Sequence, residues 1–229
     1  MALKIEKLAF RTSGLSAISN NILIVYLFLV IPTVHLWLGS QHWIAKIALD
    51  GYIFLVLTFL LLIKSISIGV LGFSIHSFKQ NIILGFFAGG SVLFCLPALD
   101  LLVKITGLSE TDLISNQPEI KTHYFSLAQI IWTIIHTVLD QLFFFGIIAQ
   151  SWLMKRNRFL VVYLIGLIFA VAHAKLTVGV FAIGLIGCLL FSMTGTLIAS
   201  GIFQIACLLS RYILETTYSH LATLLGFLF

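Results

Sequence analysis

Residues 125–154 read FSLAQIIWTIIHTVLDQLFFFGIIAQSWLM, an apolar run with one carboxylate, Asp140, far from either end. About 20 apolar residues are enough for a helix to cross the hydrocarbon core of a bilayer. A charge in the middle of such a helix costs roughly 2.5–3.5 kcal/mol on insertion scales, so it is retained where it faces other helices or water. The stretch therefore predicts a transmembrane helix with a functional site at Asp140.

The composition of the whole chain agrees with this stretch. The 229 residues are 60% hydrophobic and 9% charged, whereas soluble proteins carry about 25% charged residues. We predict an all-α, polytopic transmembrane bundle of about seven spanning helices in a single domain, residues 1–229. The predicted spans cover residues 18–38, 44–63, 81–103, 125–153, 159–176, 178–193 and 196–214. The apolar tail Leu221–Phe229 is too short to span and is expected at the interface or against the bundle.

The basic residues lie singly between the apolar runs, as is typical of side chains that orient a membrane protein. This pattern indicates membrane lipids as partners and no nucleic acid. The strongest single anchor is the cluster Lys155, Arg156 and Arg158. The positive-inside rule then places the N-terminus in the cytoplasm.

Four polar side chains form a stripe along the fourth predicted helix. Gln129, Thr133, His136 and Asp140 are four, three and four positions apart, which puts them on one helix face. We expect this stripe to face other helices or water, because lipid rejects it. Gln141 lies beside the stripe, about 100° further round the helix.

A second ionisable group, His173, lies at the same predicted depth. Asp140 is fifteen positions before Lys155, and His173 is fifteen positions after Arg158. Two antiparallel helices joined by this short loop place both side chains about 20 Å from it. A structural alternative remains, in which His136 and Asp140, at i and i+4, satisfy each other and hold helices together.

The order and spacing of these residues resemble those of the CPBP family, the CAAX-processing and bacteriocin-processing intramembrane proteases, also called Abi proteins. The family's Glu-Glu-x-x-x-Arg motif corresponds to DQLFFF at 140–145, and its Phe-x-x-x-His motif to FAVAH at 169–173. Its last motif, His-x-x-x-Asn, corresponds to QIACL at 204–208, after Gly-Thr-Leu at 195–197. The resemblance covers about residues 65–214 and implies a CPBP-like core in a bacterial inner membrane.

The motif positions depart from the family in most places. The first glutamate position holds Asp140, and the one intact position is His173; the other family positions hold Gln141, Phe145, Gln204 and Leu208. The loss of one positioned donor lowers a rate by a factor of about 10²–10³. We therefore predict a protein that has lost protease activity and acts as a scaffold or accessory subunit among other membrane proteins.

Three alternatives stay open at this point. The first is an active intramembrane endopeptidase, with Asp140 as base, His173 as its partner, and His136 or Gln204 filling the gaps, so the sequence leaves enzyme activity undecided. The second is a metal or pigment site, since His136, Asp140 and His173 suit a divalent cation; no other cofactor is expected. The third is a transporter, whose ionisable groups include His35 and Asp100.

Overall fold

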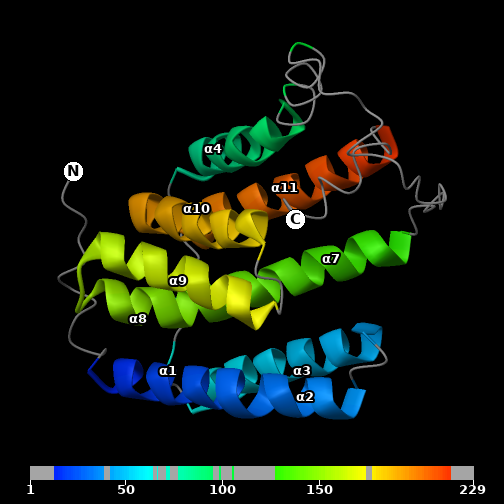
Figure 1. Ribbon diagram of the computed structural model, residues 1–229. Helices are drawn as coiled ribbons and strands as arrows, with labels where there is room; N and C mark the ends of the chain where they lie inside the picture. Colours follow the sequence, from blue (N-terminus) through cyan, green and yellow to red (C-terminus); the bar gives the residue numbers. More distant parts are fainter. Residues whose placement is uncertain are drawn as a thin grey trace.

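The computed structural model describes residues 13–38, 42–63, 77–94, 127–173 and 177–217, together with 66, 71, 72, 98 and 105. These residues are helical in seven continuous stretches and contain no strand (Figure 1). In chain order the elements are α1 (Ser13–Val25), η2 (Tyr26–Val30) and α2 (Ile31–Leu38); α3 (His42–Leu62); α4 (Phe78–Gly90) and η3 (Ser91–Phe94); α7 (Leu127–Asp140), η4 (Gln141–Ala149) and α8 (Gln150–Leu153); α9 (Arg158–Ala172); α10 (Val178–Thr194); and α11 (Leu197–Thr217). The all-α prediction is confirmed for the described residues.

Three helices are long and apolar enough to cross a membrane: Ile18–Leu38, Ile44–Leu62 and Ile130–Leu153. They match the first, second and fourth predicted spans and confirm an integral membrane protein. The other four stretches are apolar but shorter, namely Phe78–Phe94, Arg158–Ala172, Val178–Thr194 and Leu197–Arg211. Three of the seven predicted spans therefore correspond to helices that are long and apolar enough to cross a membrane.

One helix end differs from the sequence-based prediction, and another falls outside the described residues. The third predicted span runs to residue 103; the described helix reaches Phe94 with one 3₁₀ turn, and residues 95–97 and 99–103 lie outside the described part. The fifth runs to 176, but α9 ends at Ala172 because His173 leaves helical geometry, with φ −82° and ψ 2°. The backbone N–H and the ring of His173 both bond to the Phe169 carbonyl and close the helix there.

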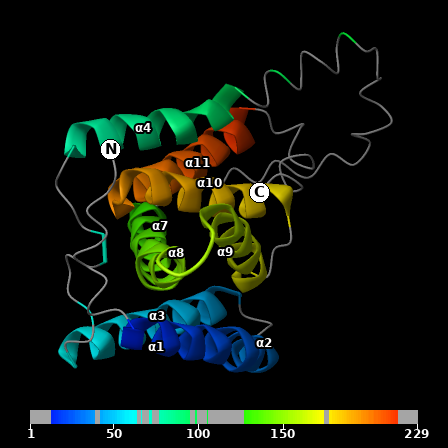
Figure 2. The same cartoon turned by 90° about the vertical axis from the view of Figure 1, so that its left-hand side faces the viewer.

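The helices form layers, seen edge-on in Figure 2. The first layer holds α1, η2, α2 and α3. The next holds the long α7–η4–α8 helix beside α9, and above it lie α10 and α11 (Figures 1 and 2). Helix α4 lies outermost and packs on α11.

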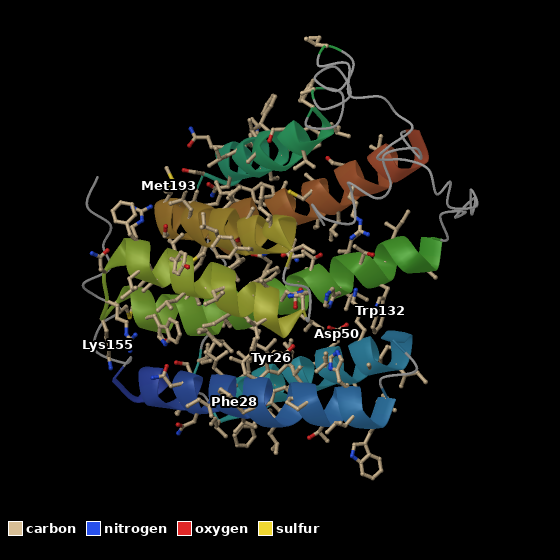
Figure 3. All side chains as sticks on the ribbon, viewed as in Figure 1. Tyr26, Phe28, Asp50, Trp132, Lys155 and Met193 are labelled. Atoms are coloured by element: carbon tan, nitrogen blue, oxygen red, sulfur yellow. The ribbon has the colours of Figure 1, made fainter. Side chains whose placement is uncertain are left out.

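The wide π-helical segment η4 is the centre of the bundle. It contacts α1, α3, α9, α10 and α11, and eight of its nine residues are buried. Its aromatic run, Phe143 to Phe145, supplies the largest fully buried side chains. On the outer helices one face is apolar and exposed, as lipid requires: Tyr26 is 3% exposed and points into the bundle, while Phe28 is 77% exposed and points outward (Figure 3).

Small residues let α4 and α11 approach closely. A Cβ atom added at Gly85 would collide with the Ala199 carbonyl, and one at Gly89 would collide with the Phe203 carbonyl and lie 2.6 Å from the Ala206 Cβ. Helices in membranes are commonly joined in this way, because there is no hydrophobic effect to drive them together in lipid. The two glycines therefore set the distance between α4 and α11.

Helix α1 is tied to α8, next to the basic turn that holds Lys155 and Arg156. Ser19 and Ser151 share a hydrogen bond of 2.8 Å, and the Trp152 indole donates to Asn20 at 2.7 Å. The Arg156 guanidinium lies over the Trp152 ring, 5.5 Å from its centroid. The basic turn, marked by Lys155 in Figure 3, and the start of α1 therefore share one end of the bundle.

Candidate functional site

Asp140 lies at the junction where α7 ends and η4 begins. Its side chain is buried, with 1% of the residue exposed. Because η4 is enclosed by five other helices, a carboxylate at its first turn faces protein and not lipid. Such π-helical segments often occur at functional sites, because they re-aim the side chains on either side.

His173 follows the last residue of α9 and contacts Asp140 directly. Its Nε2 atom lies 3.1 Å from Asp140 Oδ2, and its Nδ1 atom lies 2.8 Å from the Phe169 carbonyl oxygen. The ring also packs on Phe169, with 4.2 Å between centroids. The two ionisable groups that the sequence places at equal depth are therefore brought into contact.

His136 contacts the same carboxylate from one helical turn away. Its Nε2 atom lies 3.3 Å from Asp140 Oδ2, and its Nδ1 atom lies 2.6 Å from Oδ1 of Asp50 on α3. Figure 3 shows Asp50 between α3 and α7. The four side chains form a line, Asp50–His136–Asp140–His173, in which acids and imidazoles alternate.

Asp50 is the member of this line that the sequence-based reasoning missed. It is 3% exposed, and its Oδ2 atom has no hydrogen-bond partner among the described residues. It is the one carboxylate in the apolar run 44–63, four positions after Lys46, so a charge inside an apolar helix marks it as it marks Asp140. Its partner, His136, is 86 positions away and could not be read from any local pattern.

A cavity of about 630 Å³ reaches the line of acids and imidazoles. Three residues of the predicted stripe, Thr133, His136 and Asp140, are in its wall, while the side chain of Gln129 lies outside the described part. The ionisable groups in the wall are Tyr26, His35, Lys46, Asp50, His136, Asp140, His173 and Arg211. Cavities of about 300–1,000 Å³ with a few convergent polar groups are the usual form of small-ligand sites.

Comparison of the chain with protein-family models, with curated proteins and with solved structures finds no match. The positions that depart from the CPBP motifs lie on η4 and α11; they are Gln141, Phe145, Gln204 and Leu208.

Two of those positions bond to each other. Gln141 Nε2 donates to Gln204 Oε1 at 2.5 Å, which joins η4 to α11, and both side chains are buried. The Phe145 ring stacks near Phe169 and Phe191, with centroids 6.2 and 6.5 Å away. Leu208 lies in the cavity wall as an apolar group. Gln141 and Phe145 therefore pack or pair away from the cavity, whereas Gln204 and Leu208 line it together with Asp140 and His173.

The geometry leaves three kinds of chemistry open to the line. A carboxylate held by two imidazoles can take a proton from water, pass protons between its members, or bind a cation together with the ring nitrogens. All three need access to the cavity, which His136, Asp140 and His173 share.

Proposed function

We propose that this chain is a CPBP-like membrane protein that does not cleave peptides and acts as a scaffold or accessory subunit of a membrane assembly. Its central cavity serves as a ligand-binding pocket. The observation that supports this is the bond between Gln141 and Gln204. The resemblance puts the family's second glutamate and last histidine at these positions. An amide cannot act as a base at pH 7, and each of these amides is engaged by the other.

The remaining substituted positions support the same reading. Phe145 replaces a charged partner with an aromatic ring inside a stack, and Leu208 offers the cavity no hydrogen bond. Each lost donor costs a factor of about 10²–10³ in rate, so the set together removes most of the family's chemistry.

The same proposal includes the arrangement in the membrane. All seven helical stretches cross a bacterial inner membrane, with the N-terminus in the cytoplasm. This orientation is supported by the position of α1, whose N-terminal end lies at the same end of the bundle as the basic turn. With the N-terminus in the cytoplasm, Lys155, Arg156 and Arg158 lie on the cytoplasmic side, as the positive-inside rule expects.

The test combines cleavage with cross-linking. The full chain, purified in lipid nanodiscs, is expected to cleave a membrane-embedded peptide no faster than its Asp140→Ala variant. Photo-cross-linking in native membranes is expected to join it to another membrane protein in constant ratio. Cleavage that is lost in Asp140→Ala and His173→Ala would contradict the first half, and a chain that cross-links to nothing would contradict the second.

A second candidate function is an active intramembrane endopeptidase. The 3.1 Å contact of His173 with Asp140 at a cavity wall favours it, since a general base needs a partner and access to water. In this case Asp140→Asn abolishes cleavage of the peptide, whereas His35→Gln, a change elsewhere in the cavity wall, leaves the rate unchanged.

A further inference from the structure

Three electron-pair donors converge in the cavity wall. Nε2 of His136 and Nε2 of His173 lie 3.3 and 3.1 Å from Asp140 Oδ2. One ligand atom from each of these residues fits within 4.8 Å of the others. In a tetrahedral zinc site, bonds of about 2.0–2.2 Å put ligand atoms about 3.3 Å apart. Two of the three separations already have this length.

The protons on the two imidazoles follow from their outer partners. The Phe169 carbonyl can only accept, so Nδ1 of His173 donates to it. The Asp50 carboxylate accepts in the same way from Nδ1 of His136. In neutral rings the Nε2 atoms then carry lone pairs, and both are directed at an Asp140 oxygen that also accepts. These three acceptors repel one another unless positive charge lies among them.

Either two protons, one on each Nε2, or one divalent cation supplies that charge. The hydrogen bonds made by the two Nδ1 atoms favour the cation. A histidine that binds a metal almost always donates its other ring N–H to a carboxylate or a backbone carbonyl, which orients the ring. His136 donates to the carboxylate of Asp50 and His173 donates to the carbonyl of Phe169, so both kinds of hydrogen-bond partner typical of metal-binding histidines occur at this site.

We propose that the cavity binds one divalent transition-metal ion through Nε2 of His136, Nε2 of His173 and a carboxylate oxygen of Asp140, with Asp50 as the positioning residue of His136. Two imidazoles and one carboxylate suit zinc and its first-row neighbours, whereas magnesium and calcium take oxygen ligands. Three protein ligands leave a fourth position free for water or a ligand. The inference rests on the proposed binding role of the cavity and not on the loss of proteolysis.

The experiment titrates Co²⁺ into the full chain in nanodiscs, after removal of bound metal with a chelator. The wild-type protein is expected to bind one Co²⁺ with the visible absorption bands of a four-coordinate N/O site, and Zn²⁺ is expected to displace it. His136→Gln and His173→Gln are expected to abolish these bands. His35→Gln is the matched control, because His35 lies in the same wall but bonds to the Ile31 carbonyl and takes no part in the cluster.

Asp50→Asn separates a positioning role from a merely structural one. The amide still accepts from Nδ1 but carries no charge, so Co²⁺ is expected to bind at one per chain and about 10–100-fold more weakly. An unchanged affinity would overturn the role assigned to Asp50.

Two results would overturn the metal site itself. One is a wild-type protein of normal helical circular dichroism that shows no four-coordinate Co²⁺ bands. The other is binding that survives both histidine substitutions. Neither result depends on the cleavage assay. A protein that binds no metal and cleaves nothing contradicts the metal site but not the proposed loss of proteolysis. A protein that binds metal and cleaves the peptide supports the metal site and contradicts the loss of proteolysis.

Discussion

Asp50 and Asp140 are carboxylates inside apolar helices, and imidazoles contact both of them. A neutral His136 donates its one N–H to Asp50 without carrying a charge, whereas Asp140 needs protons or a cation between it and the two rings. This arrangement leaves the total charge of the line adjustable by protons or by a metal ion. Lysine or arginine in the same places would fix that charge.

The bond between Asp50 and His136 is expected to stabilise the fold even without metal. Asp50→Leu removes the acceptor of the half-buried His136 N–H group, which costs about 1–3 kcal/mol in the free energy of unfolding. Asp50→Asn keeps an acceptor and should lose less. Unfolding in mixed detergent micelles with a chelator present measures both variants, and an Asp50→Leu protein as stable as the wild type would contradict the expectation.

The Gln141–Gln204 bond is expected to appear as a coupling energy. Interhelical hydrogen bonds in membranes average about 0.6 kcal/mol and reach about 1.7 kcal/mol. A double-mutant cycle with Gln141→Leu, Gln204→Leu and the combined variant measures this term, since leucine replaces each amide with an apolar group of similar size. Strictly additive losses would show that the two side chains do not stabilise each other.

At the residue level, the sequence places Asp140 and His173 at one depth because both are counted from a single short turn. It could not place Asp50 beside His136, because that contact joins helices that are distant in the chain. Nor could it pair Gln141 with Gln204, because the two residues are 63 positions apart and no single short turn fixes their relative depth. Local periodicity predicts a face of one helix and not the residue opposite that face.

At the level of elements, the apolar runs predict where helices lie, and the described helices agree within a few residues at most ends. The π-helical geometry of η4 is different. Its sequence, QLFFFGIIA, is apolar all round, so it has no amphipathic face from which a turn size could be read. The wide turns follow from packing against five neighbouring helices, which is tertiary information.

The contact between α4 and α11 gives a prediction at this scale. Gly89→Ala is expected to lower the free energy of unfolding by about 1–3 kcal/mol, because the added Cβ meets the Phe203 carbonyl and Ala206. Gly90→Ala is the control, since nothing lies within 4 Å of its added Cβ. Thermal unfolding of the purified proteins compares them, and equal loss in both variants would argue against close packing as the cause.

At the level of the whole molecule, successive helical stretches alternate in direction, so successive connections lie at opposite ends of the bundle (Figure 1). Helix α9 has 15 residues, about 22 Å at 1.5 Å per residue, against a hydrocarbon core of about 30 Å. Whether α9 crosses is therefore the strictest test of the seven-span proposal.

Cysteine labelling measures this directly. In a cysteine-free background, Asn157→Cys in the basic turn is expected to react from the cytoplasmic side, and Thr177→Cys at the start of α10 from the opposite side. Asn157 is exposed and Thr177 half-buried, so a membrane-impermeant maleimide should reach the first readily and the second more slowly. Labelling of both from one side would mean that α9 does not cross the membrane.

The 86 positions between Asp50 and His136 also bear on how the protein is made. During synthesis the second helix is made before its imidazole partner, so Asp50 lacks the hydrogen bond to His136 at that stage. A carboxylate in that state costs roughly 2.5–3.5 kcal/mol, which leaves the helix only loosely committed to the membrane. The arrival of α7 then supplies the hydrogen bond from His136 that stabilises a helix made much earlier.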